Sequence, residues 1–133
     1  MHFEEYRVYY EDTDAQGFVY YANYLKFLKR ARTEYLRSLG YEQKELMEKG
    51  IIFVVRKLIV EYTKPASLDE LIKIETKLVG VKKVSFNFLQ TIYNSDSEKI
   101  CEAQVFCGSI NIESKKPMLV PEKLQTNMVK ELN

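Results

Sequence analysis

The sequence predicts an α+β fold in which an antiparallel sheet wraps around one long helix. Apolar residues from position 22 to position 39 recur at helical spacing. After position 50 the chain changes to segments that are rich in β-branched residues or that alternate between apolar and polar residues. Short turns join these segments, which is typical of antiparallel neighbours. One long helix followed by a run of strands is an α+β arrangement.

The N-terminal part predicts one strand and a loop. Residues 3–10 (FEEYRVYY) carry Tyr6, Val8 and Tyr10 on one alternating face, which is the pattern of a strand. Residues 11–17 (EDTDAQG) break this period with turn-forming residues, and Gly17 allows the backbone an unusual turn. We therefore expect a loop between the first strand and the long helix.

Two helices are predicted before position 50. The apolar stripe of residues 22–39 covers nearly half of the helix circumference, so the sheet is expected to curve around it. Gly40 provides a stop, and Asn23 or the residues just before it provide a start. A short second helix fits residues 42–49 and is closed by Gly50.

The remaining chain predicts four strands and a terminal helix. The strands are expected at residues 51–63, 71–79, 84–93 and 100–112, in hairpin-like succession. Residues 1–133 are interpreted as a single domain, with residues 121–133 as a C-terminal tail that is predicted to be helical. The second face of the sheet, or its edge, needs a partner, and formation of a homo-oligomer would provide one.

Composition excludes several classes of function. The 133 residues contain 20 Lys plus Arg and 19 Asp plus Glu, so no global field draws the chain to nucleic acid or to anionic membranes. No apolar stretch approaches the roughly 20 residues that cross a bilayer, and a secretory signal is absent, so we expect a cytoplasmic protein. Cys101 and Cys107 lie about 20 Å apart along one strand, too far to bridge each other.

Histidine is almost absent from this chain, and this limits its chemistry. The single histidine is His2, beside the chain end. Catalytic triads need an imidazole held against the nucleophile, so Ser-His-Asp and Cys-His mechanisms are disfavoured. Two cysteines and one terminal histidine are also a poor zinc set. Acid–base work must then fall to Asp, Glu, Tyr, Lys or Cys.

An acidic cluster, Glu11, Asp12 and Asp14, lies in the loop before the long helix. Three interpretations remain open on the residues alone. The carboxylates could form Asx-turns or helix caps, or they could hold Mg²⁺ or Ca²⁺, which needs more oxygen ligands than the loop provides. Asp14 could instead lie beside the helix start, where free N–H groups would stabilise an oxyanion while the carboxylate attacks or activates water.

Two further groups of residues have a structural and a functional interpretation. Lys82 and Lys83 occupy a turn between two strands, where they form either a solvated, edge-protecting turn or a phosphate site. Five tyrosines crowd the region of the acidic loop, and most of them are expected to pack in the core or at an interface. They are Tyr9, Tyr10, Tyr20, Tyr21 and Tyr24.

Residues 10–34 (YEDTDAQGFVYYANYLKFLKRARTE) resemble the signature of the hot-dog-fold acyl-CoA thioesterases, in particular the YbgC-like and 4-hydroxybenzoyl-CoA thioesterase group. The later strand order and strand lengths also look like this fold, so the resemblance covers nearly the whole chain and thins after about residue 121. The signature consists of Asp12-Thr13-Asp14, Gly17, Val19-Tyr20, Ala22-Asn23-Tyr24-Leu25 and Ala31-Arg32.

The resemblance implies roles for single residues. The family's catalytic carboxylate corresponds to Asp14, acting as nucleophile or as general base. The residue whose backbone N–H polarises the thioester carbonyl corresponds to Tyr21, where YbgC-like members often carry histidine. Tyr10 matches a tyrosine near the catalytic carboxylate. Basic residues that hold coenzyme A phosphates correspond to Lys82 and Lys83.

Gly17 and Asn23 of the same signature complete the expected substrate-binding set. The resemblance also implies two subunits that join their sheets, with active sites at the shared boundary, in a homodimer or homotetramer. The implied reaction is hydrolysis of the thioester of acyl-CoA, or of acyl carrier protein, to a free acid and a thiol, with no metal or redox cofactor.

Two alternatives to this reaction remain. A binding module could hold acyl-CoA or acyl carrier protein without turnover. A hot-dog dehydratase or hydratase would typically need an active-site histidine, which the chain lacks beyond His2. The sequence does not specify the acyl group.

Overall fold

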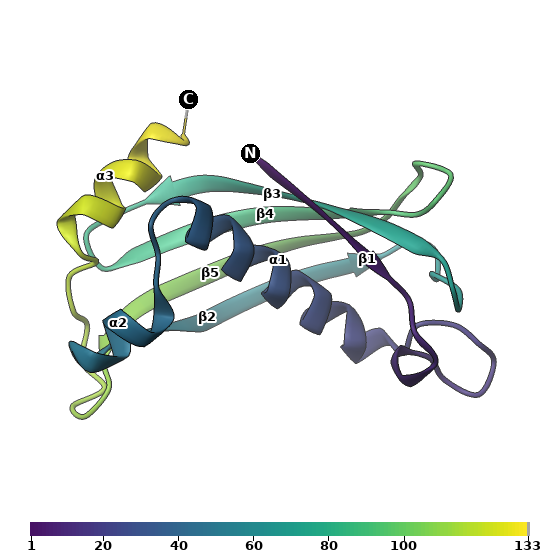
Figure 1. The fold of residues 1–133 in the computed structure, drawn as a ribbon, viewed down its shortest axis with the longest axis horizontal. Helices are drawn as coiled ribbons and strands as arrows, with labels where there is room; N and C mark the ends of the chain where they lie inside the picture. Colours follow the sequence, from purple (N-terminus) through teal and green to yellow (C-terminus); the bar gives the residue numbers. More distant parts are fainter. Residues whose placement is uncertain (133) are drawn as a thin grey trace.

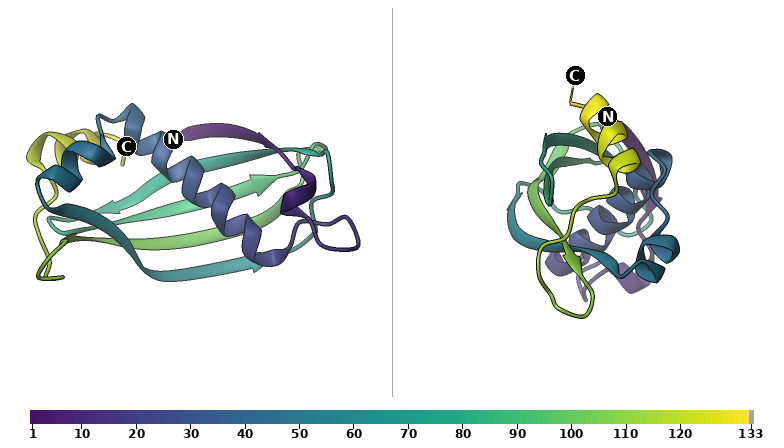
Figure 2. Two further views of the ribbon diagram at one scale, coloured as in Figure 1. Left: turned by 60° about the horizontal axis from the view of Figure 1, so that its bottom comes forward. Right: turned by 90° about the vertical axis from the view of Figure 1, so that its left-hand side faces the viewer.

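A five-stranded antiparallel sheet curves around one long helix in the computed structural model, which describes residues 1–132 (Figure 1). Figure 2 shows the sheet as one layer and the helix as the other, with two short helices at one end. This arrangement confirms the predicted α+β fold. The elements are β1 (His2–Arg7), α1 (Tyr24–Ser38), α2 (Gln43–Glu48), β2 (Ile51–Tyr62), β3 (Leu71–Val81), β4 (Ser85–Tyr93), β5 (Lys99–Asn111) and α3 (Glu122–Lys130), with single 3₁₀ turns η1 (Tyr10–Asp12) and η2 (Tyr21–Asn23).

The strand order is β1-β3-β4-β5-β2, so β1 and β2 form the two edges of the sheet. Strands β3, β4 and β5 follow one another as predicted, but β2 pairs with β5 rather than with β3. The hairpin-like succession was therefore wrong for β2. Residues 63–70 carry the chain from one edge region to the other at one end of the sheet, and Pro65 within them cannot donate a ladder hydrogen bond.

Helix α1 buries its apolar stripe on the concave face of the sheet, as its periodicity predicts. The facing strands present alternate side chains, and Phe86 and Phe88 meet edge to face with ring centroids 5.6 Å apart. Each fully buried side chain of this size contributes about 1.5–3 kcal/mol. The buried residues of α1 are Tyr24, Phe27, Leu28, Ala31, Tyr35 and Leu36.

The first strand is shorter than predicted. Val8 is buried as expected, but Tyr10 opens turn η1 and its side chain is 76% exposed. The backbone N–H and side-chain hydroxyl of Thr13 both donate to the Tyr10 carbonyl, at 3.0 and 2.7 Å. The carboxylate of Asp12 accepts from the Tyr9 N–H at 2.9 Å. These local bonds end the strand although the alternating pattern continues.

Strand β2 is irregular and carries exposed apolar side chains along the free edge. Its register against β5 shifts between Val55 and Lys57, so Arg56 is the extra residue of a β-bulge. The Arg56 side chain lies on Gly108, where a Cβ atom would stand 2.8 Å from Arg56 Cδ. The exposed apolar residues of β2 are Val55 (49%), Leu58 (38%), Ile59 (41%) and Tyr62 (42%).

The N-terminal ammonium forms an ion pair with Glu131, just after α3. The Met1 ammonium lies 3.1 Å from the Glu131 carboxylate, which also accepts a 2.6 Å hydrogen bond from the Tyr35 hydroxyl. The C-terminal segment predicted to be helical contains α3, and residue 133 lies outside the described residues. Cys101 and Cys107 do not bridge each other, as predicted, and both are buried.

Helices in the described part of the chain are too short or too polar to cross a membrane.

Candidate active site

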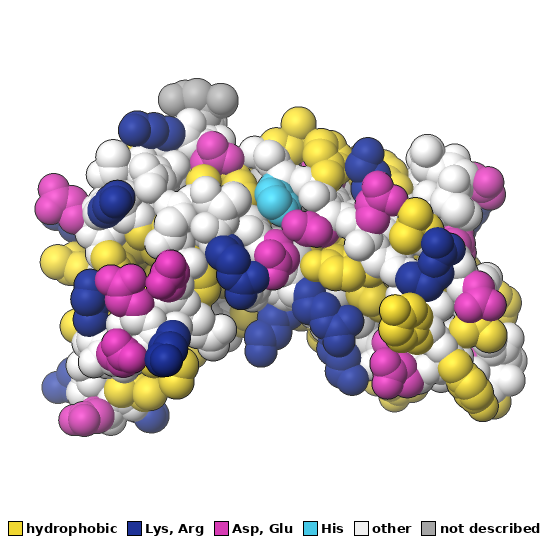
Figure 3. Space-filling model, viewed as in Figure 1, with side chains coloured by type: hydrophobic (Ala, Val, Ile, Leu, Met, Phe, Trp, Pro, Cys, Tyr) yellow, Lys and Arg dark blue, Asp and Glu magenta, His cyan; other side chains and the backbone are white. Residues whose placement is uncertain are grey.

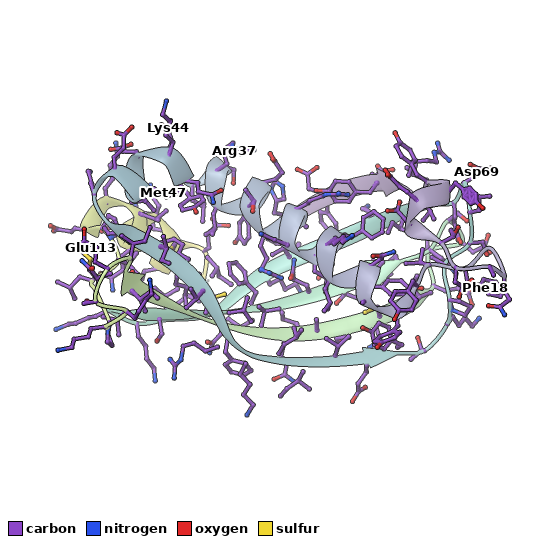
Figure 4. All side chains as sticks on the ribbon, turned by 90° about the horizontal axis from the view of Figure 1, so that it is seen from below. Phe18, Arg37, Lys44, Met47, Asp69 and Glu113 are labelled. Atoms are coloured by element: carbon purple, nitrogen blue, oxygen red, sulfur yellow. The ribbon has the colours of Figure 1, made fainter. Side chains whose placement is uncertain are left out.

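The loop before α1 rests on the segment that follows β2. The Val19 N–H donates to the Ala66 carbonyl at 2.9 Å, and the Leu68 N–H donates to the Gly17 carbonyl at 2.9 Å. Gly17 has φ +82°, which confirms the unusual turn expected there. Figure 4 shows Phe18 and Asp69 together at this end of the molecule, with Arg37 and Lys44 toward the other end. The loop is thus held by backbone hydrogen bonds to one segment, residues 66–68, that lies far from it in sequence.

Asp14 has one oxygen engaged and one oxygen available. Its Oδ1 accepts hydrogen bonds from the backbone N–H groups of Gln16 and Phe18, at 2.9 and 3.3 Å. Its own N–H donates to the Phe18 carbonyl at 2.8 Å. These hydrogen bonds match the Asx-turn interpretation, and they orient the carboxylate while engaging only one of its oxygens. Within residues 1–132, Oδ2 has no hydrogen-bond partner.

The helix start lies beside this loop and is connected to it by a side chain. The Asn23 amide donates from Nδ2 to the Asp12 carbonyl at 2.9 Å. Asn23 occupies the N-cap position of α1, where the helix start was expected, but its side chain makes no capping hydrogen bond, since its amide is used to hold the loop. Tyr21 and Ala22 open turn η2, and in the described chain no acceptor faces the Tyr21 N–H. A free amide therefore lies next to the Asp14 loop.

A cavity of about 260 Å³ opens beside the helix start. The Tyr24 hydroxyl accepts from the Ala66 N–H at 2.9 Å, and the Tyr62 hydroxyl donates to the Tyr21 carbonyl at 3.0 Å. Burial raises the pKa of both phenols, and the Asp14 carboxylate adds to the shift at Tyr24. Asp14 does not line this cavity. Its walls are Val19, Tyr21, Tyr24, Tyr62, Thr63, Lys64 and Pro65.

Tyr62 was missed by the sequence analysis. Nothing in the sequence distinguishes it from the other aromatic residues of a β-rich segment. Its contact with Tyr21 depends on the return of β2 to the loop end of the molecule, which the predicted strand succession did not contain. Tyr24 was interpreted as a packing residue, and it is buried as expected.

The other predicted site residues are spread over a wider area. Tyr10 lies on the surface of the loop, and within residues 1–132 its hydroxyl makes no hydrogen bond to Asp14. Lys82 and Lys83 are exposed at the turn between β3 and β4. Lys82 lines a groove of about 490 Å³ together with Arg56 and Lys57. The loop and this groove therefore form two separate regions of one protomer.

The groove is rich in cations for a local reason. The bulge in β2 places two consecutive basic residues, Arg56 and Lys57, against it, and the Lys57 ammonium lies 5.5 Å from the centre of the Phe106 ring. In the described part of the chain no acidic side chain lines it, and the other walls are Gly80, Ser85, Phe86 and Asn87. Arg56 was not identified from the sequence, because a bulge leaves no signal in the pattern of side chains.

A metal interpretation of the acidic loop finds no support in its geometry. The carboxylates of Asp12 and Asp14 are each turned onto backbone N–H groups. No group of three His, Cys, Asp or Glu side chains with metal-binding geometry occurs in residues 1–132.

A curved antiparallel sheet around one long helix defines the hot-dog class of proteins. Residues 8–128 match the model of the thioesterase-like superfamily, and the chain belongs to this family.

The chain is similar to known proteins over about 90% of its length. An acyl-CoA thioester hydrolase YbgC from Escherichia coli O6:H1 is 42% identical over 118 residues, which are 89% of this chain and 88% of the relative. An acyl-CoA thioesterase YbgC from Haemophilus influenzae is 40% identical over 90% of this chain and 88% of its own. The crystal structure of a probable thioesterase from Bartonella henselae superposes with a TM-score of 0.83 at 35% identity, covering 90% of this chain and 98% of that one.

Proposed function

We propose that this chain hydrolyses acyl-CoA thioesters, with Asp14 as the acidic group and the Tyr21 N–H as the oxyanion donor. The observation that carries the proposal is the link between the two: the hydrogen bond from Asn23 to the Asp12 carbonyl holds the Asp14 loop against the helix start. The named activity of the relatives at 40–42% identity supports the same reaction.

The chemistry follows from the two groups. As the thioester carbonyl is attacked, its oxygen gains negative charge, which the free Tyr21 N–H and the positive end of α1 stabilise. One such donor is typically worth about 3 kcal/mol in the barrier. Two N–H groups fix Oδ1 of Asp14 and leave Oδ2 to react.

The free Oδ2 has two routes to the same products. As nucleophile, Oδ2 forms an acyl anhydride with the carbonyl carbon, the C–S bond breaks, coenzyme A leaves as thiolate, and water then cleaves the anhydride. As general base, Oδ2 takes a proton from the attacking water and returns it to the thiolate. Both routes yield a carboxylic acid and a free thiol.

Binding of the carrier is assigned to the basic residues. Lys82 and Lys83, together with Arg56 and Lys57 at the groove, would hold the phosphates of coenzyme A, because no carboxylate lines that groove. Gly17 would admit the thioester beside the loop, since it has no side chain. Acyl carrier protein is the second carrier that such a surface could accept, and we propose that the protein acts in the cytoplasm.

The β2 edge is the surface through which we propose that two copies pair. It is long, its outer side is unpaired within residues 1–132, and it exposes Val55, Leu58, Ile59 and Tyr62 beside its charged residues. Such an edge favours the addition of another strand. Self-pairing of antiparallel strands about a two-fold axis reverses their direction. The Phe53 end of β2 would then lie beside the Tyr62 end of its partner, so the active loop of each copy would be next to the far half of α1 of the other.

The acid is tested by Asp14→Asn, which keeps the size of the side chain and the acceptor for Gln16 and Phe18. We expect kcat to fall at least about 1000-fold in a thiol-release assay, because only the reacting oxygen is lost. Glu11→Gln is the matched control, an exposed carboxyl in the same loop, and it should retain turnover. Near-normal turnover by Asp14→Asn on every acyl-CoA that the wild type cleaves would refute the assignment.

The same assay separates the enzyme from a binding module. Saturable binding of short, long and aromatic acyl-CoA without any release of thiol would identify a module that only holds its ligand.

A further inference from the structure

A second cavity, of about 290 Å³, lies between α1 and strands β2, β4 and β5. Aromatic rings form much of its wall: Tyr41 stacks on Phe53 at 5.3 Å, and Phe53 meets Phe86 edge to face at 4.9 Å. Figure 3 shows a hollow on the lower side of the molecule with Lys and Arg side chains beside it. The cavity is lined by Lys29, Arg32, Thr33, Leu36, Tyr41, Gln43, Phe53, Val54, Val55, Phe86, Phe88 and Cys107.

Arg32 is held in this cavity by a single polar contact. Its guanidinium donates to Gln90 Oε1 at 3.0 Å. Gln90 is completely buried, and its Nε2 donates to the Leu28 carbonyl and to Thr76 Oγ1, both at 3.0 Å. The Gln90 amide is therefore fixed, and it fixes one side of the guanidinium. Among residues 1–132 the other N–H donors of Arg32 have no partner.

The cavity carries uncompensated positive charge. Within residues 1–132 no Asp or Glu lines it, whereas Lys29 adds a second cation. Burial raises the pKa of the Cys107 thiol to about 11, so this neighbour is uncharged at neutral pH. Burial also lowers the pKa of Arg32, which shows that the charged form is partly desolvated. A desolvated guanidinium with free donors is stabilised strongly by an anion that reaches it.

We propose that this cavity receives acyl groups that end in a carboxylate, and that Arg32 selects them. The inference rests on the proposed thioesterase function and names the substrate class for it. The methylene groups of such an acyl chain would pack on Phe53, Phe86 and Phe88, while the terminal carboxylate would meet the free donors of Arg32. In the proposed dimer the chain would enter from the partner's loop, which lies beside the Phe53 end of β2.

A phosphate of coenzyme A fits this cavity less well. Its walls are largely aromatic and aliphatic, and such walls suit a carbon chain rather than a doubly charged group. The groove with Arg56, Lys57 and Lys82 is more polar and has three cations. The two kinds of anion can be distinguished by kinetics. Loss of a phosphate contact would lower kcat/KM equally for all acyl-CoA substrates, whereas loss of a carboxylate contact would lower it only for carboxylated ones.

The test compares pairs of acyl-CoA substrates of equal length, one with a terminal carboxylate and one without. Succinyl-CoA is paired with butyryl-CoA, glutaryl-CoA with valeryl-CoA, adipyl-CoA with hexanoyl-CoA, and suberyl-CoA with octanoyl-CoA. For the wild type we expect kcat/KM to favour the carboxylated member by about tenfold or more at one length at least. Arg32→Met should abolish this ratio, and Arg32→Lys should retain part of it.

Arg30→Met is the matched control. Arg30 lies on the same helix with its guanidinium 5.8 Å from the Phe27 ring, and it does not line the cavity. Its replacement should leave the ratio unchanged. Because each ratio compares two substrates on one preparation, partial unfolding of a variant does not change it.

Three results would count against the inference. A wild type that shows no preference at any length would overturn it without any variant. An equal loss by Arg32→Met on both members of each pair would assign Arg32 to the phosphates or to folding. Absence of thiol release from all eight substrates and from aromatic acyl-CoA would instead defeat the proposed function itself.

Discussion

The two edges of the sheet differ in length and in chemistry. Edge strand β1 has 6 residues, and its Phe3 ring is covered by the Lys73 ammonium at 4.5 Å from the ring centre. Glu5 and Arg7 are exposed along it, and Met1, which precedes it, is bound to Glu131. Edge strand β2 has 12 residues and exposes apolar side chains through its second half.

This difference supports the proposal that β2, and not β1, is the edge through which two copies pair. Proteins protect the sheet edges that must stay single with charge and short length, and β1 has both. Strand β2 is twice as long, and although it carries Arg56, Lys57 and Glu61 it also exposes four apolar side chains. Both regions that we propose for the reaction are attached to it. The loop with Asp14 rests on the segment that follows Tyr62, and the cavity with Arg32 includes Phe53 near the other end. Strand β1 closes the fold, whereas β2 connects the parts of the site.

Among changes at the two edges, the largest effect should come from placing charge on the β2 edge. In the double variant Leu58→Lys/Ile59→Lys, like charges of two copies would oppose each other along the proposed pairing. We expect monomers in size-exclusion chromatography with light scattering, and a loss of kcat/KM on the order of 100-fold, because orientation of the substrate by the second copy is lost.

Glu5→Lys provides the same kind of change on β1, where Glu5 is exposed. It should leave both the assembly and the activity near those of the wild type. If the β2 variant stays dimeric and active, or if the β1 variant dissociates, the functional contrast between the edges is lost.

A smaller effect is expected where β2 meets the helix start. Tyr62→Phe removes the hydrogen bond to the Tyr21 carbonyl and keeps the ring that packs on Tyr24 at 5.3 Å. One such bond is worth about 1 kcal/mol, so kcat should fall about fivefold through looser placement of the Tyr21 N–H. KM should change little. Tyr93→Phe, on β4, is the control, and an equal loss in both variants would remove the special role of Tyr62.

The smallest effect concerns stability at the β1 edge. The hydrogen bond from the Tyr35 hydroxyl, aided by the Met1 ammonium, lowers the pKa of the Glu131 carboxyl below its usual 4.5. The ionised form is therefore favoured in the folded state. Its contribution is complete above the usual pKa and is lost as the pH falls through the lower, folded value.

Glu131→Gln should reduce the free energy of unfolding by about 1 kcal/mol at pH 7. Urea denaturation should show the difference from the wild type shrinking as the pH falls below 4.5, while thiol release at pH 7 stays unchanged. A difference that grows in acid would contradict the sign of this linkage, and a loss of activity would tie β1 to the site after all.

Much of this fold could be predicted because its core is periodic. The stripe of α1 and the alternating strands β3 to β5 are specified by residues that must be buried, so the pattern and the structure agree. The end of β1 was not predictable in this way. Tyr10 continues the alternation, but the turn formed by Asp12 and Thr13 ends the strand with hydrogen bonds that periodicity does not record.

The candidate site was only partly predictable, for a related reason. Asp14 could be chosen because the chain lacks an internal histidine and because its motif resembles a family signature. Tyr62 could not be identified, since its bond to Tyr21 depends on which strand β2 pairs with. Arg32 belongs to the same signature, but its lack of a carboxylate partner is a property of the packed cavity and not of the helix sequence.

The bulge at Arg56 fixes the register in which the β2 edge can pair. If two such strands pair, a shift of the register by one residue would place the bulge of one strand opposite a regular part of the other. It would also turn every side chain to the wrong face of the sheet. The strand can then accept many changes in the identity of its residues and few in their number. Comparative surveys of related chains should find substitutions throughout this segment but almost no insertions or deletions.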